Sequence, residues 1–240
     1  MGVEMIGRTG RKIYSIEVPR SMSDQVYQIL REAIMANEFR PGDRLVELQL
    51  AELLKASRTP IREAIRRLEH DGLVERLPQG GVRVKPVTIE SVRQVYGLRG
   101  VLEAYAVIQA CDRITEEDFS ALDQIRNQAL ELMKNKTMDS VEKTHRILAL
   151  NTDFHDTLNQ LCEDAYLLKM LDVVHQEVVR MRGLALQDKA NWEEVWDQHK
   201  ELLKLMRTGE KKKLDEFVKY HAARGAEYVM NALKKTHETD

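Results

Sequence analysis

The chain has 240 residues, a formal net charge of −2, 43% apolar and 32% charged residues, and two cysteines. This composition is typical of a globular, helix-rich protein, and no apolar run approaches the roughly 18–20 residues that cross a bilayer. The first 20 residues lack the apolar core of a secretory signal, and two cysteines cannot form a disulfide framework. We therefore expect a cytoplasmic protein without a membrane segment, and the near-zero charge argues against a strongly basic, non-specific nucleic-acid binder.

Charge and proline content divide the chain near residue 86. All five prolines lie in the first 86 residues. Residues 1–87 carry three excess positive charges, whereas residues 88–240 carry five excess negative charges. Because proline interrupts helices, the sequence predicts a basic arm over residues 1–20, a mixed domain over 21–86 and an all-helical domain over 87–240.

The mixed domain has the pattern of three helices followed by a β-hairpin. Ser23 and Ser57 are the expected caps of the first and third helices, and Gly72 is expected to end the third. Helices are expected at about 23–36, 47–55 and 58–71, the second burying Leu48, Ala51 and Leu54 or their neighbours, and strands at 73–77 and 82–85 around a glycine-containing turn. This order of elements predicts a winged helix-turn-helix.

The third predicted helix carries a row of arginines. Arg58, Arg62 and Arg66 recur every fourth residue, so they share one face, opposite an apolar face formed by Ile61, Ala64, Ile65 and Leu68. A guanidinium fork can bind phosphate or the O6/N7 edge of guanine, and a helix fits the major groove of DNA. An arginine row by itself is also compatible with an ordinary solvated face. The order of elements around it favours DNA reading.

After residue 87 the apolar residues repeat with the period of an α-helix. The pattern predicts an all-α six-helix bundle, with helices at about 88–111, 116–135, 139–163, 165–186, 191–208 and 210–236. Thr88 and Thr115 are suitable N-caps followed by acidic residues in the first turn. Some 150 residues are enough for this domain to have its own core.

Polar residues interrupt the apolar stripes of three of these helices. Asn151 and His155 are one turn apart, and His199 and His221 lie on the inward faces of the last two helices. Neutral imidazole is a common ligand for Zn, Ni, Fe or Mn ions. Each histidine could instead be a hydrogen-bonded core group. His175 lies on a further stripe, as a rival inward histidine or a group behind the ligands.

The first domain resembles the DNA-binding domain of GntR-family transcription regulators. The resemblance rests on Phe39-Arg40-Pro41-Gly42-Asp43-Arg44-Leu45, Leu50-Ala51-Glu52 and the stretch from Ser57 to Val74. It implies that Arg58, Thr59 and Arg62 contact operator DNA and that Gly80 lets the hairpin tip enter the minor groove. That family often has an arginine where this chain has Leu48, so one contact is missing.

The second domain resembles the FCD domain, the ligand-binding half of FadR-type (VanR-like) GntR regulators. The resemblance rests on Asn151-Thr152-Asp153-Phe154-His155, with His199 and His221 further on. It implies one divalent ion held by Asn151, His155, His199 and His221, although the family usually has an acid at the position of Asn151. The ion in such proteins typically anchors a small organic acid, and an arginine completes the site.

Two arginines are candidates for contacting that acid. Arg99 is the first, because its neighbours on the predicted helix are apolar, and Arg182 is the second. A salt bridge from Arg99 to Glu103, four residues on, is the alternative role. We also assign His175 to the effector site.

Together these features predict a dimeric transcription repressor rather than an enzyme. Two copies are expected because helix-turn-helix dimers read paired half-sites. Operator DNA, a small organic acid and a second copy of the chain are the expected partners. One alternative is a DNA-binding regulator with a purely structural metal and no effector. A metal-dependent enzyme is disfavoured, because no general base lies at a motif spacing.

Overall fold

The computed structural model describes residues 5–6, 12–13, 21–185 and 190–237. The arm expected over residues 1–20 lies outside the described residues, apart from β1 (Met5–Ile6) and β2 (Lys12–Ile13), which pair antiparallel. The chain forms two compact units that divide between Lys85 and Pro86, and the short segment Met35–Glu38 is grouped with the second. Each unit is described by itself.

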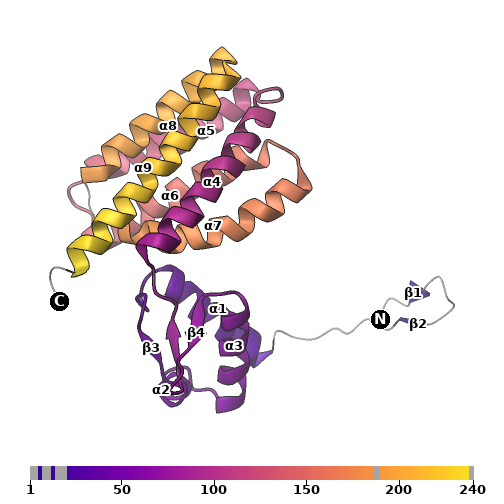
Figure 1. Ribbon diagram of the computed structural model, residues 1–240, viewed down its shortest axis with the longest axis vertical. Helices are drawn as coiled ribbons and strands as arrows, with labels where there is room; N and C mark the ends of the chain where they lie inside the picture. Colours follow the sequence, from indigo (N-terminus) through magenta and orange to yellow (C-terminus); the bar gives the residue numbers. More distant parts are fainter. Residues whose placement is uncertain (1–4, 7–11, 14–20, 186–189, 238–240) are drawn as a thin grey trace. The chain divides into compact units, whose positions relative to one another are not determined.

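The first unit combines three helices with a three-stranded antiparallel sheet (Figure 1). Its elements are α1 (Met22–Met35), β3 (Arg44–Leu45), α2 (Glu47–Leu53), α3 (Arg58–His70), β4 (Val74–Arg76) and β5 (Val82–Val84). The strand order is β3-β5-β4, with Leu45 opposite Val82 and Val74 opposite Val84. The winged helix-turn-helix is therefore confirmed, and β3 adds a strand that the sequence did not predict.

Three local predictions in this unit need correction. Ser21, not Ser23, caps α1: its Oγ accepts from the Asp24 amide and the Asp24 carboxylate accepts from the Ser21 amide. This reciprocal pair needs an acceptor three residues on, which Ser23 lacks. Ser57 is the N-cap of α3 by backbone geometry, but its side chain makes no capping hydrogen bond. In α2 the neighbour Leu50 is buried, whereas Leu48 is 56% exposed.

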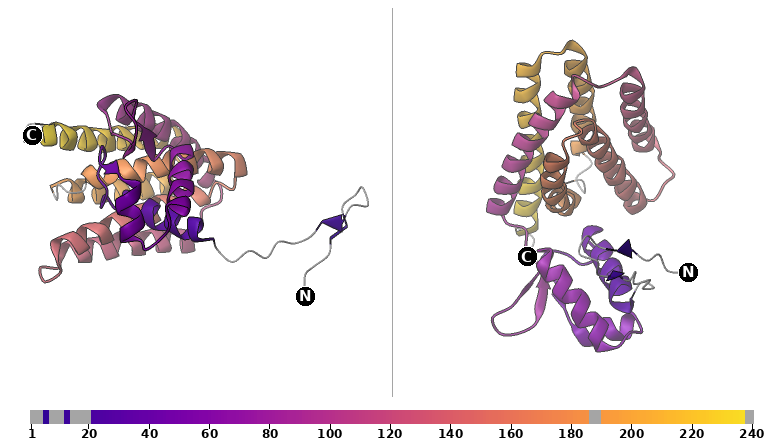
Figure 2. Two further views of the ribbon diagram at one scale, coloured as in Figure 1. Left: turned by 90° about the horizontal axis from the view of Figure 1, so that it is seen from below. Right: turned by 90° about the vertical axis from the view of Figure 1, so that its right-hand side faces the viewer.

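The second unit consists, in the described residues, of six helices (Figure 2). Capping boxes begin α4 and α5 at Thr88 and Thr115, as predicted. Gly209, with a φ of 69°, separates the last two helices. The helices are α4 (Ile89–Ala110), α5 (Glu116–Lys134), α6 (Ser140–Gln160), α7 (Ala165–Ala185), α8 (Ala190–Thr208) and α9 (Lys211–His237). The mainly α fold is therefore confirmed.

Helices α4 and α9 run alongside each other and form the most extensive helix pair of this unit (Figure 1). Gly100 permits their close approach, since an added Cβ would lie 3.3 Å from the Cβ of Ala222. Phe154 of α6 and Trp196 of α8 are fully buried in the core beside them. None of the described helices combines the length and apolar content that a membrane span requires.

Candidate functional site

Three histidines from three helices meet in the core of the helical unit. His155 of α6, His199 of α8 and His221 of α9 are all buried. One nitrogen of each lies within 4.8 Å of the other two, and the Nε2 atoms of His155 and His221 are 3.4 Å apart. The structure thus brings together the three histidines that the sequence singled out.

A chain of hydrogen bonds fixes the orientation of His221. The Gln198 side-chain nitrogen donates to Glu194 at 3.1 Å, so the Gln198 oxygen faces the other way, 2.7 Å from Nδ1 of His221. Because that oxygen can only accept, Nδ1 carries the hydrogen. Nε2 therefore presents its lone pair on the side of His155.

His199 has two buried ring nitrogens that find no hydrogen-bond partner among the described residues. Its ring stacks on Phe154, with centroids 4.1 Å apart, and meets Trp196 edge-on. Leaving a buried polar atom unpaired costs about 1–3 kcal/mol. A metal ion held by His155, His199 and His221 would satisfy one of the two His199 nitrogens. The three imidazoles therefore fit a divalent transition metal.

The three imidazoles are held in the neutral form. Burial, followed by the charges of Arg99 and Arg182, lowers the pKa of His155 well below its usual range. Burial and the neighbouring His221 do the same to the pKa of His199. Burial lowers the pKa of His221 to about 3. Neutral imidazole is the form that binds metal, so each ring has one nitrogen with a lone pair at neutral pH.

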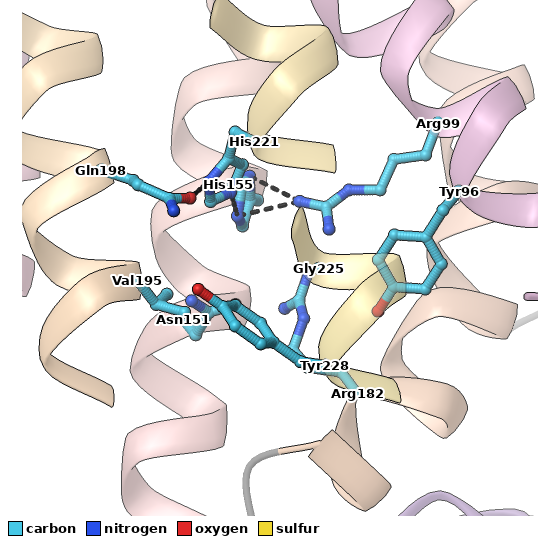
Figure 3. A pocket seen from close by; sticks show the side chains of 10 residues that line it. All are labelled: Tyr96, Arg99, Asn151, His155, Arg182, Val195, Gln198, His221, Gly225 and Tyr228. Atoms are coloured by element: carbon cyan, nitrogen blue, oxygen red, sulfur yellow. Dashed lines mark hydrogen bonds between the residues drawn. The ribbon is translucent and has the colours of Figure 1, made fainter. Parts of the chain in front are cut away.

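A pocket beside the histidines contains the fourth predicted ligand. Asn151 is buried one turn before His155 on α6 and lines this pocket (Figure 3). The histidine pocket, as we call it, is lined by Tyr96, Arg99, Asn151, His155, Arg182, Val195, Gln198, His221, Gly225 and Tyr228. His199 lies next to this lining, against His155 and His221.

Gly225 lies in the wall of the histidine pocket, where the Tyr96 ring packs against it. A Cβ added there would lie 2.8 Å from Cε1 of Tyr96. The space that a glycine leaves one turn after His221 is therefore filled by the Tyr96 ring. This contact brings α4 against α9 at the edge of the pocket.

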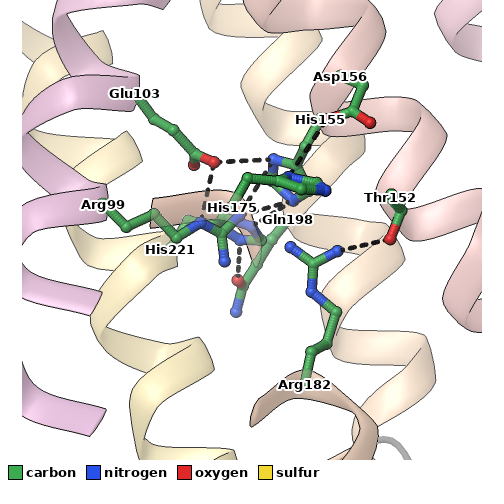
Figure 4. Close-up of polar contacts among 9 residues, drawn as sticks. All are labelled: Arg99, Glu103, Thr152, His155, Asp156, His175, Arg182, Gln198 and His221. Atoms are coloured by element: carbon green, nitrogen blue, oxygen red, sulfur yellow. Dashed lines mark hydrogen bonds and ion pairs between the residues drawn. The ribbon is translucent and has the colours of Figure 1, made fainter. Parts of the chain in front are cut away.

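Arg99 combines the two roles that the sequence left open. Its Nε donates to Glu103 at 2.9 Å in a buried salt bridge, and its Nη2 lies 2.9 Å from Nε2 of His155 (Figure 4). A guanidinium can only donate, so Arg99 uses the lone pair of His155 in this structure. The same Nη2 lies 3.1 Å from Nδ1 of His155, so Arg99 and a metal ion would compete for the lone pair of this ring.

Arg182 differs from Arg99 in its charged neighbours. Its side chain is buried, with the residue 5% exposed, and Nη1 lies 3.3 Å from Oγ1 of Thr152. Within the described residues no carboxylate forms an ion pair with it. Burial and the charge of Arg99 lower the pKa of Arg182 to about 10, so it stays protonated at neutral pH. Among the described residues, the buried positive charge of Arg182 in the histidine pocket therefore has no anion paired with it.

His175 lies outside the histidine pocket. Its Nδ1 is 3.2 Å from Oδ1 of Asp156, and it lines a separate groove between α6 and α7. Sequence reasoning missed Gln198 and Tyr228 as pocket residues. Tyr228 lies seven residues after His221, on the same helical face, which is a usable signal. Gln198 is adjacent to His199 in the chain, so only the packing of α9 reveals its role.

The predicted DNA-contact residues lie on the exposed face of α3 and at the tip of the hairpin. Arg58, Thr59, Arg62 and Arg66 are exposed. Two of them contact Glu47 of α2, with Arg62 at 2.7 Å and Arg58 at 3.3 Å. Gly80 has a φ of 89° and no atom within 4 Å of an added Cβ, so the hairpin tip is open to a partner.

A winged helix-turn-helix with an exposed arginine row, joined to a separate helical unit, is the architecture of a DNA-binding regulator. Residues 22–84 match the family of bacterial regulatory proteins called gntR, and residues 94–224 match the FCD domain. The chain therefore belongs to the GntR family of transcription regulators and carries an FCD domain. The prediction of a DNA-binding regulator rather than an enzyme is confirmed by this family and its relatives.

Several transcription regulators match most of the chain. The HTH-type transcriptional regulator YdhC of Bacillus subtilis (strain 168) is 27% identical over 94% of this chain and 98% of its own. The Nta operon transcriptional regulator of Aminobacter aminovorans is 28% identical over 82% of this chain and 89% of its own length. The solved structure of McbR/YncC from E. coli has the same fold, with a TM-score of 0.70 and 20% identity over 88% of this chain and 98% of that one.

Proposed function

We propose that this chain is a dimeric repressor whose DNA binding is controlled by a small organic acid bound in the helical unit through a divalent metal. The observation that carries the proposal is the buried group of three neutral histidines beside Arg182, a buried cation without an ion-pair partner among the described residues. Such a pocket attracts an anion. A purely structural metal would give Arg182 no role.

The DNA-binding half of the proposal rests on α3 and the hairpin. Arg58, Thr59, Arg62 and Arg66 would contact phosphates and base edges in the major groove. Gly80 would let the hairpin tip approach the minor groove. A base contact of this kind contributes about 1–3 kcal/mol of discrimination, so the reading of an operator depends on several of them together.

Two apolar stripes support dimerisation. Leu98, Val101 and Tyr105 are exposed along one side of α4, and Tyr166, Met170 and Val173 along one side of α7. The two helices pack against each other, and exposed apolar residues in such rows are typical of interfaces. We propose that a second copy covers them. Val101→Asp should convert the dimer to a monomer in sedimentation experiments, whereas an unchanged mass would remove α4 from the interface.

The effector is proposed to be a carboxylate. Asn151, His155, His199 and His221 would hold the metal, which supplies a Lewis-acidic centre for a carboxylate oxygen. Arg182 would pair with the same carboxylate, and Arg99 would contact it after releasing His155. The relative RspR of E. coli, a transcriptional repressor 26% identical over 74% of this chain, supports repression. A repressor of this kind acts on chromosomal DNA, which is consistent with a cytoplasmic location.

Metal and acid binding can be tested without knowing the operator. The purified chain should retain stoichiometric zinc or a similar metal after dialysis, and a panel of small organic acids should raise its melting temperature. Stabilisation by an acid should disappear in chelator and in Arg182→Leu, while Lys204→Leu, at an exposed ion pair of α8, should leave it unchanged. Acid stabilisation that survives chelator would contradict the metal-anchored site.

A further inference from the structure

The helical unit contains a second hollow region next to the histidine pocket. An open groove of about 600 Å³ lies between α6 and α7, lined by Asp156, Asn159, Gln160, Leu168, Leu171, Asp172 and His175. A narrow inner chamber, with room for about one water-sized group, shares Asn159, Leu171 and His175 with it and reaches Arg99 and Glu103. Arg99 also lines the histidine pocket. The Arg99 side chain therefore lies between the inner chamber and the histidine pocket, and its release from His155 would open a path between them.

Asn159 is the residue that points to a ligand here. It is 7% exposed and lines both the groove and the inner chamber. Its side-chain oxygen is buried and accepts no hydrogen bond from any described residue. An unpaired buried carbonyl is costly, so this oxygen is set to accept from a group that enters the chamber.

The position of Asn159 relates it to the metal-binding histidines. Asn151, His155 and Asn159 follow one another every fourth residue of α6, so each step along this face is about 6 Å. All three are buried. A ligand whose carboxylate is held beside His155 would therefore reach Asn159 with a tail about one helical turn long.

The other polar groups of the groove favour a tail that donates hydrogen bonds. Asp156 and Asp172 add acceptors, and His175 is paired with Asp156 at 3.2 Å (Figure 4). A second metal ion is not favoured, since the described residues contain one group of ligands at metal spacing, and it is the three histidines. The chamber thus combines the unpaired oxygen of Asn159 with apolar walls from Leu171, Val174 and Val178.

We infer that the effector is a small organic acid with a hydroxyl or ammonium group at its far end, and that Asn159 accepts a hydrogen bond from that group. Asp156 and His175 would border the tail at the groove. This inference rests on the proposed function, because it places the carboxylate at the histidine pocket. Beyond the proposed function, it gives the chemical class of the effector's tail and assigns recognition of that tail to residues of α6 and α7.

The test compares matched acids on the full-length, zinc-loaded chain. The probes are propanoate, butanoate and pentanoate, each beside its terminally hydroxylated and terminally aminated counterpart, with affinities measured by calorimetry. A buried hydrogen bond predicts that a terminal donor improves affinity about fivefold at one of these lengths. The hydroxyl and amino series distinguish a neutral tail from a cationic one.

Variants then assign the gain to Asn159. Asn159→Leu should abolish the gain but leave the affinity of the unsubstituted acid unchanged, and Asn159→Asp, which keeps an accepting oxygen, should restore it for the amino series. Asn127→Leu, the same change at an exposed site on α5, should keep the full gain. Retained circular dichroism and zinc content establish that each variant is folded.

The outcomes separate this inference from the proposed function. Unsubstituted acids that bind without any gain from a terminal donor, or a gain that survives Asn159→Leu, would overturn the inference and leave the metal-anchored acid site standing. Binding of none of the acids to the zinc-loaded chain would overturn both.

Discussion

At the scale of single residues, the histidine pocket is an arrangement of buried groups that do not fully satisfy one another. Glu103 balances Arg99, whereas Arg182 has Thr152 as a neutral neighbour and His199 keeps both nitrogens unpaired among the described residues. A buried charge without a partner is costly. A cation at the histidines and an anion at Arg182 would therefore stabilise the pocket, and this would be the physical basis for the proposed coupled binding of a metal and an acid.

The neutral histidines predict that the metal-free protein loses stability as the pH falls. The unfolded chain takes up protons near pH 6.5, whereas burial, together with the charges of Arg99 and Arg182, keeps the three histidines unprotonated in the folded state. Each then contributes a slope of about 1.4 kcal/mol per pH unit below pH 6.5. Urea unfolding in chelator at pH 7.5, 6.5 and 5.5 measures this.

Two variants test whether the buried histidines cause that pH dependence. His199→Leu should reduce the slope by about 1.4 kcal/mol per pH unit, because one of the buried neutral histidines is gone. His70→Asn, at a side chain that is 90% exposed, should leave the slope unchanged. A free energy of unfolding that stays constant from pH 7.5 to 5.5 would show that the histidines are not buried in the neutral form.

Replacing Gly225 by alanine should destabilise the protein, and the same change at Gly97 of α4 is the control. Gly225→Ala places a methyl group 2.8 Å from the Tyr96 ring, so the ring must shift at a cost of about 1–3 kcal/mol. Gly97→Ala has open space and should instead stabilise α4 by about 0.5–1 kcal/mol. Thermal unfolding measures both, and equal effects of the two substitutions would contradict the packing of Tyr96 on α9.

At the scale of elements, α2 contacts the arginine row of α3. The Glu47 carboxylate contacts Arg62 and Arg58, and these contacts lower the pKa of Glu47. Exposed pairs of this kind contribute little to stability, about 0–1 kcal/mol. Their effect is to hold two flexible side chains in fixed places and to offer a competing anion when phosphate approaches.

Removing that carboxylate should change DNA binding more than folding. Glu47→Gln is expected to raise affinity for DNA of unrelated sequence several-fold, since the competing anion is lost, and to reduce the preference for DNA selected from a randomised library. Fluorescence anisotropy at several salt concentrations measures both. Glu52→Gln, an exposed change on the same helix, is the control. A Glu47→Gln variant with unchanged affinities would show that α2 does not govern these arginines.

The helices were predictable where a long apolar repeat of helical period follows an N-capping residue. The six helices of the second unit agree with their predicted ranges within a few residues, because Thr88 and Thr115 mark the starts and the apolar stripes are long. The first unit was harder. Strand β3 has two residues, Arg44 and Leu45, too few to show a period, and it forms only because β5 lies beside it.

The candidate site was predictable in its histidines but not in its connections. His155, His199 and His221 each interrupt an apolar stripe, so one helix at a time reveals them. The Gln198 contact to His221 joins α8 to α9, and the contact of Arg99 with His155 joins α4 to α6. Such contacts depend on how the helices pack, which a periodic pattern does not specify.

At the scale of the whole molecule, the near-zero net charge is the sum of two opposite parts. The DNA-reading portion is weakly basic and the helical portion is acidic, with excesses of three positive and five negative charges. Bulk attraction to DNA is therefore modest. We expect affinity to depend on the specific contacts of α3 and on two half-sites bound by one dimer, so a signal that changes the dimer can change DNA binding.

The most direct test of this account is the affinity of the full-length chain for DNA selected from a randomised library, with and without zinc and an acid that raises its melting temperature. The account predicts that zinc and the acid together weaken DNA binding at least fivefold, consistent with a coupling of about 1–3 kcal/mol, and that chelator or Arg182→Leu abolishes the change. An affinity that is the same with and without the bound acid would contradict it.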